Sequence, residues 1–174
     1  MRKKANIILT GFMGTGKSTV GKKIADRLEW LFVDTDVLIE EEAEMTIPAI
    51  FAERGEPYFR ALERAVITRV CLEAEKVIAT GGGAIMDEEN IRVLKENGTL
   101  ICLTAQPEVI LSRVQSNTDR PLLRGEDPLT KITMLLNARA EAYEKADFTV
   151  DTSYFTVDEV VEAICAHLRT ILRT

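Results

Sequence analysis

The sequence is poor in several residue types that mark particular protein classes. Its 174 residues include three cysteines, one histidine and one tryptophan. Cys71, Cys102 and Cys165 are scattered, odd in number and without metal-ligand spacing, which indicates a reducing compartment and small packed apolar side chains rather than a metal site. The one histidine, His167, falls on an expected helix and is assigned no role.

Long apolar runs and an excess of basic residues are also missing. No stretch reaches the length of a transmembrane helix, and the amino-terminal segment MRKKANIILTG turns to glycine too soon for a signal peptide. The net charge of −6 argues against nucleic acid as the main partner. We therefore expect a cytoplasmic protein with no membrane and no nucleic-acid partner.

The remaining composition is that of an ordinary globular domain, with 46% hydrophobic and 29% charged residues. The length suits one domain over residues 1–174, and no internal repeat or linker interrupts it. Short apolar runs alternate with longer amphipathic stretches, which predicts an α/β fold with a parallel sheet and helices on both faces. Ligands of such sheets lie beyond the carboxyl ends of the strands. The expected strands, of which the first four are predicted to be buried on both faces, are Ala5–Thr10, Leu31–Asp34, Lys76–Thr80, Leu100–Thr104 and Phe148–Asp151.

The clearest motif follows the first expected strand. Residues Gly11–Ser18 read GFMGTGKS, which satisfies the P-loop pattern G-x-x-x-x-G-K-[ST] between a strand and a helix. The glycines let backbone N–H groups curl around phosphate oxygens, and the helix points its positive end at the same place. Lys17 would bring a cation to the β- and γ-phosphates, and the Ser18 hydroxyl could ligate Mg²⁺. The alternative is a glycine-rich turn without a ligand. The loop does not indicate whether the phosphate passes to water, to protein or to a small molecule.

Two aspartates end the second expected strand. Asp34 and Asp36 are residues i and i+2, so they share a face of an extended chain. One carboxylate could hold the water shell of Mg²⁺, and the other could accept a hydrogen bond from a substrate hydroxyl. A solvated strand end or a helix cap is the alternative interpretation.

Further candidates lie on later elements. Arg60 and Glu63 can pair on one helix face, and their spacing alone favours an ordinary surface ion pair. The glycines at 81–83 follow the third strand, where they suit either a close backbone approach to a ligand or a flexible turn. Arg139, on a later helix, could bind a carboxylate with both nitrogens or simply lie on the surface.

Residues 116–127 (SNTDRPLLRGED) break the alternation of strands and helices. A connection this long between two helices is typical of a lid or a binding loop. Arg120 and Arg124 lie within it and Arg113 lies just before it, and phosphoryl transfer needs mobile positive charge that closes over the γ-phosphate. Solvated loop arginines are the alternative. Asp127, followed by proline, predicts the N-cap of the next helix.

Taken in order, these features resemble the shikimate kinase family. The matching segments run from Gly11 to about Asp151 and read GFMGTGKSTVG, VDTDVLIE, IF…GE..FR.LE, ATGGGA, DRPLL and the arginine–tyrosine motif at Arg139. The P-loop is common to many kinases and NTPases, whereas the combination of the other segments is far more specific. The resemblance implies the small fold of nucleoside monophosphate kinases, a three-layer α/β sandwich with a five-stranded parallel sheet in the order 2-3-1-4-5. It also implies a lid at about 116–127 and a substrate-binding helical region at about 35–62.

The resemblance further implies a reaction and its residues. The family transfers the γ-phosphate of ATP, with one Mg²⁺, to the 3-hydroxyl of shikimate on the route to chorismate and the aromatic amino acids. ATP, Mg²⁺ and shikimate are therefore the expected ligands, and a monomer is the expected state. The implied catalytic residues are Lys17, Asp36 and Arg120; the ATP-binding residues are Gly14, Thr15, Gly16, Lys17, Ser18, Thr19, Arg113 and Arg120. The implied substrate-binding residues are Asp36, Arg60, Gly82 and Arg139, supported by Glu63, and the metal would be held by Ser18 and, through water, by Asp34.

A few positions depart from the family pattern. Glu44 stands where a glycine is common, and Ala49, preceded by Pro48, stands where an acid is usual. Thr46 is still expected to cap the helix whose first turn contains this proline. The segment 153–155 reads Ser-Tyr-Phe where the family often carries an arginine near the adenine.

Three other interpretations compete. A different small-molecule P-loop kinase, such as a gluconate kinase, would share the loop, the lid and a hydroxy-acid substrate, but the aspartate, arginine–glutamate and triple-glycine segments argue against it. A nucleotide-dependent regulatory module would need no acceptor pocket. An NTPase switch would need a way to position water, and no glutamine motif for that purpose is evident.

Overall fold

The computed structural model describes residues 6–115 and 127–172. Its centre is one parallel sheet in the strand order β2-β3-β1-β4-β5, which confirms the expected order. The strands are β1 Asn6–Gly11, β2 Leu31–Asp34, β3 Lys76–Ala79, β4 Gly98–Thr104 and β5 Phe148–Asp151. The predicted strands agree with these to within two residues at each described end.

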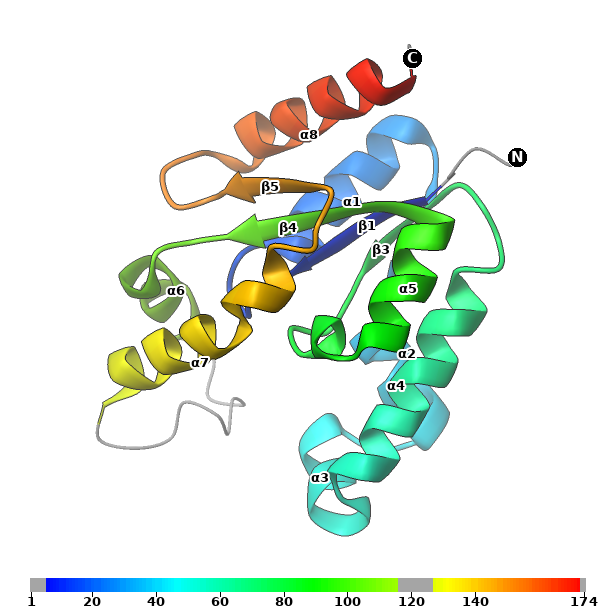
Figure 1. Ribbon diagram of the computed structural model, residues 1–174, viewed down its shortest axis with the longest axis vertical. Helices are drawn as coiled ribbons and strands as arrows, with labels where there is room; N and C mark the ends of the chain where they lie inside the picture. The colour runs from blue at the N-terminus through cyan, green and yellow to red at the C-terminus, as the bar shows by residue number, and fades with distance from the viewer. Residues whose placement is uncertain (1–5, 116–126, 173–174) are drawn as a thin grey trace.

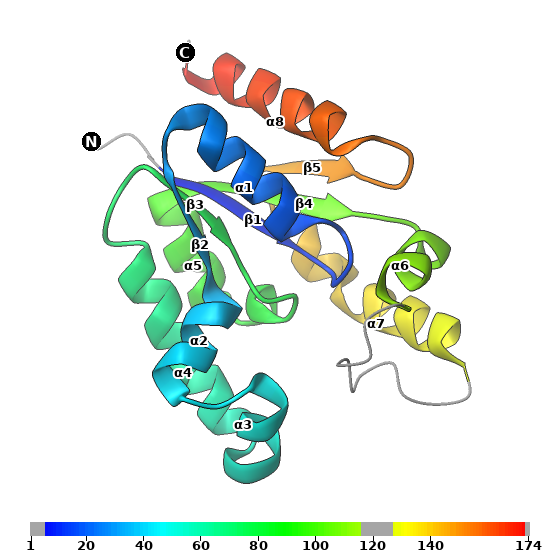
Figure 2. The same cartoon turned by 180° about the vertical axis from the view of Figure 1, so that it is seen from behind.

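Helices cover both faces of the sheet, as the alternating pattern predicted (Figures 1 and 2). The helices are α1 Lys17–Leu28, α2 Thr35–Ala43, α3 Ile47–Arg54, α4 Glu56–Val70, α5 Glu88–Asn97, α6 Pro107–Val114, α7 Pro128–Tyr143 and α8 Val157–Leu172, with a short 3₁₀ helix, η1, at Ala84–Met86. α1 and α8 lie on one face, and α4 and α5 lie on the other. Among the helices within the described ranges, none combines the length and apolar character needed to span a bilayer.

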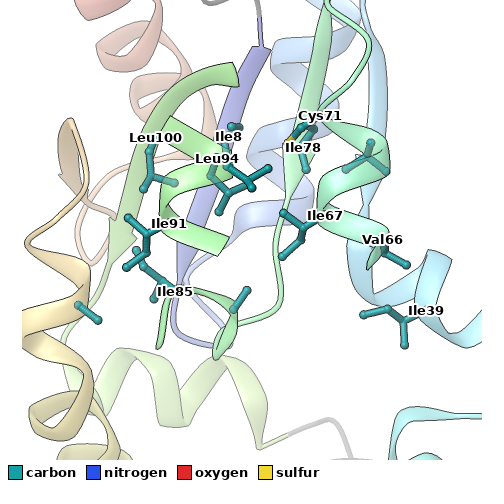
Figure 3. Packing of buried hydrophobic residues seen from close by; sticks show 14 of the residues in the cluster. Ile8, Ile39, Val66, Ile67, Cys71, Ile78, Ile85, Ile91, Leu94 and Leu100 are labelled. Carbon is teal, nitrogen blue, oxygen red and sulfur yellow. The ribbon is translucent and has the colours of Figure 1, made fainter. Parts of the chain in front are cut away.

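The alternation of side chains along β1 divides the core between the two faces. Ile8 belongs to the cluster under α4 and α5, where it packs with Ile78 and Leu100 of the neighbouring strands. Figure 3 shows this cluster from close by. Ile7 and Leu9 point the other way, into the cluster under α1 and α8. The central strand is therefore fully buried, and it holds the loop that follows it on a rigid base.

The prediction that β2 is buried on both faces is wrong. Leu31 is 60% exposed, and the other residues of this strand are only partly buried. The reason is the strand order, because β2 lies at the edge of the sheet with β3 as its one neighbour.

The predicted helix caps are confirmed. Asp127 accepts a hydrogen bond from the Thr130 N–H at 3.0 Å at the start of α7. Thr46 accepts one from the Ala49 N–H at 3.4 Å at the start of α3. These caps satisfy N–H groups that have no partner within the helix.

Candidate functional site

The P-loop turns sharply from β1 into α1. Gly16 precedes the helix with φ of +96°, a left-handed conformation that favours glycine, and no side chain caps the helix. A Cβ at Gly11 would lie 2.1 Å from the carbonyl oxygen of Leu103 on β4, so no larger residue fits there. The uncapped start of α1 and the close packing of the loop provide a place for an anion.

Lys17 lies within this loop. Its ammonium group donates hydrogen bonds to the carbonyl oxygens of Gly11 at 2.8 Å and Phe12 at 2.9 Å. These contacts fold the Lys17 side chain back over the P-loop. The charge is thereby held where a phosphate bound by the loop would meet it.

A cavity of about 490 Å³ opens at the carboxyl ends of the strands. It brings together the P-loop, the end of β2 with the start of α2, and the residues that follow β3, as expected for a parallel sheet. Its lining residues are Met13, Gly14, Gly16, Lys17, Ser18, Thr19, Asp34, Asp36, Val37, Glu40, Thr80, Gly82 and Arg113.

Ser18 and Asp34 meet on one side of the cavity. The Ser18 hydroxyl donates a hydrogen bond of 2.9 Å to Asp34 Oδ2, and Asp34 Oδ1 accepts one of 3.0 Å from the N–H of Asp36. One hydroxyl and one carboxylate beside a phosphate loop fit Mg²⁺, which completes its shell with water and phosphate oxygens. Within residues 6–115 and 127–172, no group of three or more histidine, cysteine or acidic side chains could hold a metal ion on its own.

Asp36 also lines the cavity, from the first turn of α2. Burial, first, and then the negative charges of Asp34 and Glu63 raise the pKa of Asp36 to about 6, against the opposing effect of Lys17. A carboxylate with such a pKa is a better proton acceptor near neutral pH than an exposed aspartate.

Arg60 and Glu63 form a salt bridge on α4, with Arg60 Nη1 2.8 Å from Glu63 Oε2. The interpretation of this pair as an ordinary surface ion pair is wrong, because the Glu63 side chain is only 1% exposed. Burial raises the pKa of Glu63, and the hydrogen bond and charge of Arg60 oppose that change. A second carboxylate, Glu56, lies 3.3 Å from Arg60 Nε and holds the other side of the guanidinium.

Arg139 reaches the site from α7. Its Nη1 donates to the carbonyl oxygen of Gly82 at 3.2 Å, and the Tyr143 hydroxyl donates to the same oxygen at 3.0 Å. The guanidinium also lies over the ring of Phe12, 5.4 Å from its centroid.

The three glycines after β3 pack against different side chains of the site. A Cβ at Gly81 would lie 2.6 Å from Asp36 Oδ1, and one at Gly83 would lie 2.9 Å from a guanidinium nitrogen of Arg60. At Gly82 the nearest side-chain atom is Arg139 Nη1, at 3.4 Å. The glycines therefore allow the backbone to approach Asp36 and both arginines closely, and this segment lies in contact with the site rather than away from it.

Arg113, on α6, bridges the P-loop and the segment after β5. Its Nη1 donates to the carbonyl oxygen of Gly14 at 3.1 Å, and its Nη2 donates to that of Thr152 at 2.7 Å. A second cleft, of about 210 Å³, opens beside it. The lining of this cleft is mainly apolar and consists of Thr15, Gly16, Thr19, Val20, Arg113, Thr152, Phe155, Val157 and Val160.

Most of the predicted site residues are therefore placed around the two adjoining cavities. Arg120 and Arg124 lie outside the described residues, as does all of the predicted lid except Asp127. Sequence reasoning gave no role to Glu40, which lines the larger cavity, or to Tyr143. Glu40 follows Asp36 by four positions, and Tyr143 follows Arg139 by four positions. This spacing places each on the same helix face as a predicted site residue, and it was the signal in the sequence that could have identified them.

Comparisons with known proteins agree on one family. The family model for shikimate kinase matches residues 13–169. A shikimate kinase from Thermoanaerobacter pseudethanolicus is 48% identical over 159 residues, which are 91% of this chain and 93% of the relative. The solved structure of the Acinetobacter baumannii shikimate kinase in complex with shikimate superimposes with a TM-score of 0.91 at 36% identity, over 97% of this chain and 94% of that one. A gluconokinase from Sinorhizobium meliloti shares only the fold, with a TM-score of 0.58 and 16% identity over 98% of this chain and 95% of that one.

Proposed function

The chain belongs to the shikimate kinase family, and from this premise we propose that it transfers the γ-phosphate of ATP to the 3-hydroxyl of shikimate. The observation that carries the proposal is the arrangement around the triple-glycine segment. Gly81 lies against Asp36, which faces the P-loop cavity, while Gly82 and Gly83 lie against Arg139 and Arg60. A hydroxyl-binding carboxylate and two carboxylate-binding cations thus lie within the span of one short loop. This suits a small hydroxylated acid.

The donor half of the site would be the P-loop. We assign the ATP phosphates to the segment from Gly14 to Thr19, where Lys17 would follow the γ-phosphate as it moves. Ser18 would ligate Mg²⁺ directly and Asp34 would hold it through water, and the bound ion would supply positive charge at the phosphates. The hydrogen bond between Ser18 and Asp34 supports this assignment, because it holds the hydroxyl and carboxylate oxygens together on one side of the cavity.

The acceptor half would centre on Asp36. Its carboxylate would orient the attacking hydroxyl in line with the γ-phosphate and accept the proton late in the reaction. Its pKa of about 6 suits that role near neutral pH. Arg60 and Arg139 would grip the substrate carboxylate, with the backbone of Gly82 between them. A neutral alcohol would leave both cations poorly paired and would therefore bind weakly.

Other parts of the chain complete the proposal. Arg120 would bring positive charge to the phosphates from a lid at about 116–127, and Arg113 would lie near the adenine. The helical region at about 35–62 would bind the substrate. We propose that residues 1–174 form one domain that acts as a cytoplasmic monomer on small molecules, without a nucleic-acid or membrane partner.

One assay separates this proposal from its competitors. ADP release is measured with ATP and Mg²⁺ in the presence of shikimate, of gluconate or of no acceptor. We expect ADP release that depends on shikimate. Equal release without an acceptor would identify an NTPase, dependence on gluconate would identify a sugar-acid kinase, and no release with any acceptor would favour a regulatory module. Each of these results would overturn the proposal.

A further inference from the structure

Glu40 is an acidic side chain of the site region that the proposed reaction leaves without a role. It lies on α2 one helical turn after Asp36, so the two carboxylates share a face, and both line the larger cavity. Glu40 Oε1 accepts a hydrogen bond of 2.8 Å from the backbone N–H of Ile47, the first residue of α3. A wall residue of the cavity is thus bound directly to the start of the next helix.

The corner between α2 and α3 depends on Glu40 through its backbone as well. The carbonyl oxygen of Glu40 accepts a hydrogen bond from the Met45 N–H at 3.2 Å, where the chain turns through the left-handed residue Glu44. The Ile47 N–H belongs to the first turn of α3, where no carbonyl within the helix can accept it. The carboxylate of Glu40 therefore ties the start of α3 to α2, beside the cap that Thr46 provides.

The position of α3 bears on the carboxylate-binding arginine. Phe51 of α3 packs on Phe59 of α4, with ring centroids 4.7 Å apart. The guanidinium of the next residue, Arg60, lies over the same Phe59 ring, 5.1 Å from its centroid. A continuous series of contacts thus runs from Glu40 through α3 to the aromatic surface that supports Arg60.

We propose that Glu40 is a positioning residue for the acid substrate, acting through the start of α3 and the Phe51–Phe59 pair on Arg60. The inference rests on the proposed function, because it concerns binding of shikimate by that site. It does not require Glu40 to touch the substrate. What the reaction needs from Glu40 is an oxygen that accepts the Ile47 N–H, and a neutral amide oxygen can also supply it.

The test compares Glu40→Ala, Glu40→Gln and Glu40→Asp by steady-state kinetics. Glu40→Ala removes the acceptor of the Ile47 N–H. Glu40→Asp keeps the negative charge, but its shorter side chain places the carboxylate farther from Ile47. Both should raise KM for shikimate roughly three- to ten-fold, with kcat and KM for ATP within about two-fold of the parent. Glu40→Gln should restore KM for shikimate to within about two-fold, because its side-chain oxygen accepts the same bond.

A matched control comes from the other face of the sheet. Glu159 on α8 also accepts a backbone N–H at a helix start, that of Thr156 at 2.7 Å, and its side chain is exposed. Glu159→Ala should lower the melting temperature by an amount similar to that of Glu40→Ala and leave KM for shikimate unchanged. If Glu159→Ala raises KM as much, the effect reflects loss of stability alone and the inference is wrong.

A double-mutant cycle tests the route through Arg60. In an Arg60→Ala background, Glu40→Ala should change KM for shikimate by less than about two-fold, because the group that it positions is gone. Full additivity would overturn the inference, as would an unchanged KM in Glu40→Ala or equal damage in Glu40→Gln. These results differ from failure of the proposed function, in which the parent protein itself would not phosphorylate shikimate.

Discussion

Arg60 and Glu63 share a salt bridge of 2.8 Å whose two ends differ sharply in exposure, with 27% of the arginine side chain and 1% of the glutamate side chain open to solvent. The glutamate oxygen that does not contact Arg60, Oε1, is buried and has no hydrogen-bond partner among the described residues. Arg60 is therefore the main cation that compensates the buried carboxylate, with a smaller effect of Arg139, and the carboxylate orients Arg60 toward the glycine segment.

Because Glu63 is buried, removing Arg60 alone should destabilise the protein more than removing the charges of both residues. Arg60→Ala should lower the free energy of unfolding at pH 7 by about 2 kcal/mol, because it leaves Glu63 buried without its partner. The double variant Arg60→Ala/Glu63→Gln should recover at least half of that loss, because a neutral amide costs less to bury. Urea unfolding of the three proteins checks both values. A double variant no more stable than Arg60→Ala would show that the loss does not come from the unpaired charge of Glu63.

The two arginines should act mainly on the acid substrate. Arg60→Ala or Arg139→Ala should raise KM for shikimate roughly 10- to 100-fold, the range expected for a lost hydrogen bond to a charged group. KM for ATP should change little. Arg64→Ala is the matched control, because Arg64 lies one turn after Arg60 on α4 and pairs with Asp87 instead. If acid binding is unaffected while ATP binding fails, the assignment of the carboxylate site is wrong.

Lys17 should be indispensable for transfer. Lys17→Met removes the cation from the P-loop and should reduce kcat to the assay background, because no other described side chain of the loop carries a positive charge. Lys22→Met removes an exposed cation from the same helix and should leave the rate unchanged. Near-normal turnover by Lys17→Met would refute the assignment of the phosphate site.

The stability of the ligand-free protein should reflect the pKa of Asp36. This pKa is about 6 in the folded state against an ordinary value of 3.8, so the folded protein binds the proton more tightly than the unfolded chain does. The contribution of Asp36 to the free energy of unfolding is therefore largest at low pH. It falls by up to roughly 3 kcal/mol as the pH rises from about 4 to about 6. Asp36→Asn should therefore raise the melting temperature more at pH 8 than at pH 4, while abolishing phosphorylation. Equal changes at the two pH values would argue against the raised pKa.

The corner after α2 carries removable strain. Glu44 has φ of +51°, a left-handed conformation that disfavours every residue with a side chain. Glu44→Gly should stabilise the protein by about 1 kcal/mol. Glu41→Gly, placed within the helix, should destabilise it by a similar amount. Thermal unfolding measures the change in stability of both variants. Destabilisation by Glu44→Gly would show that the backbone at Glu44 is not strained.

Local patterns predicted the strands, the P-loop and the helix caps, because each depends on residues that are near one another in the sequence. The exposure of β2 and the burial of Glu63 were not predictable in this way. The exposure of β2 follows from its place at the sheet edge, and the burial of Glu63 follows from the packing of α4 against the glycine segment.

The hydrogen bonds around the site that sequence reasoning missed join distant parts of the chain. Tyr143 binds the carbonyl of Gly82, 61 positions earlier, and Arg113 binds Thr152, 39 positions later. No periodicity connects such pairs. Only the fold brings them together.

The identity of the product tests most sharply whether this chain phosphorylates shikimate. The protein is incubated with ATP, Mg²⁺ and shikimate, and the products are analysed by mass spectrometry and by ³¹P–¹H correlation NMR. We expect equal amounts of ADP and a monophosphate of shikimate, with phosphorus coupled to the proton on carbon 3. Phosphate on another hydroxyl would contradict the proposed orientation of the substrate at Asp36, and ADP with free inorganic phosphate alone would contradict the claim that this cavity is a kinase site.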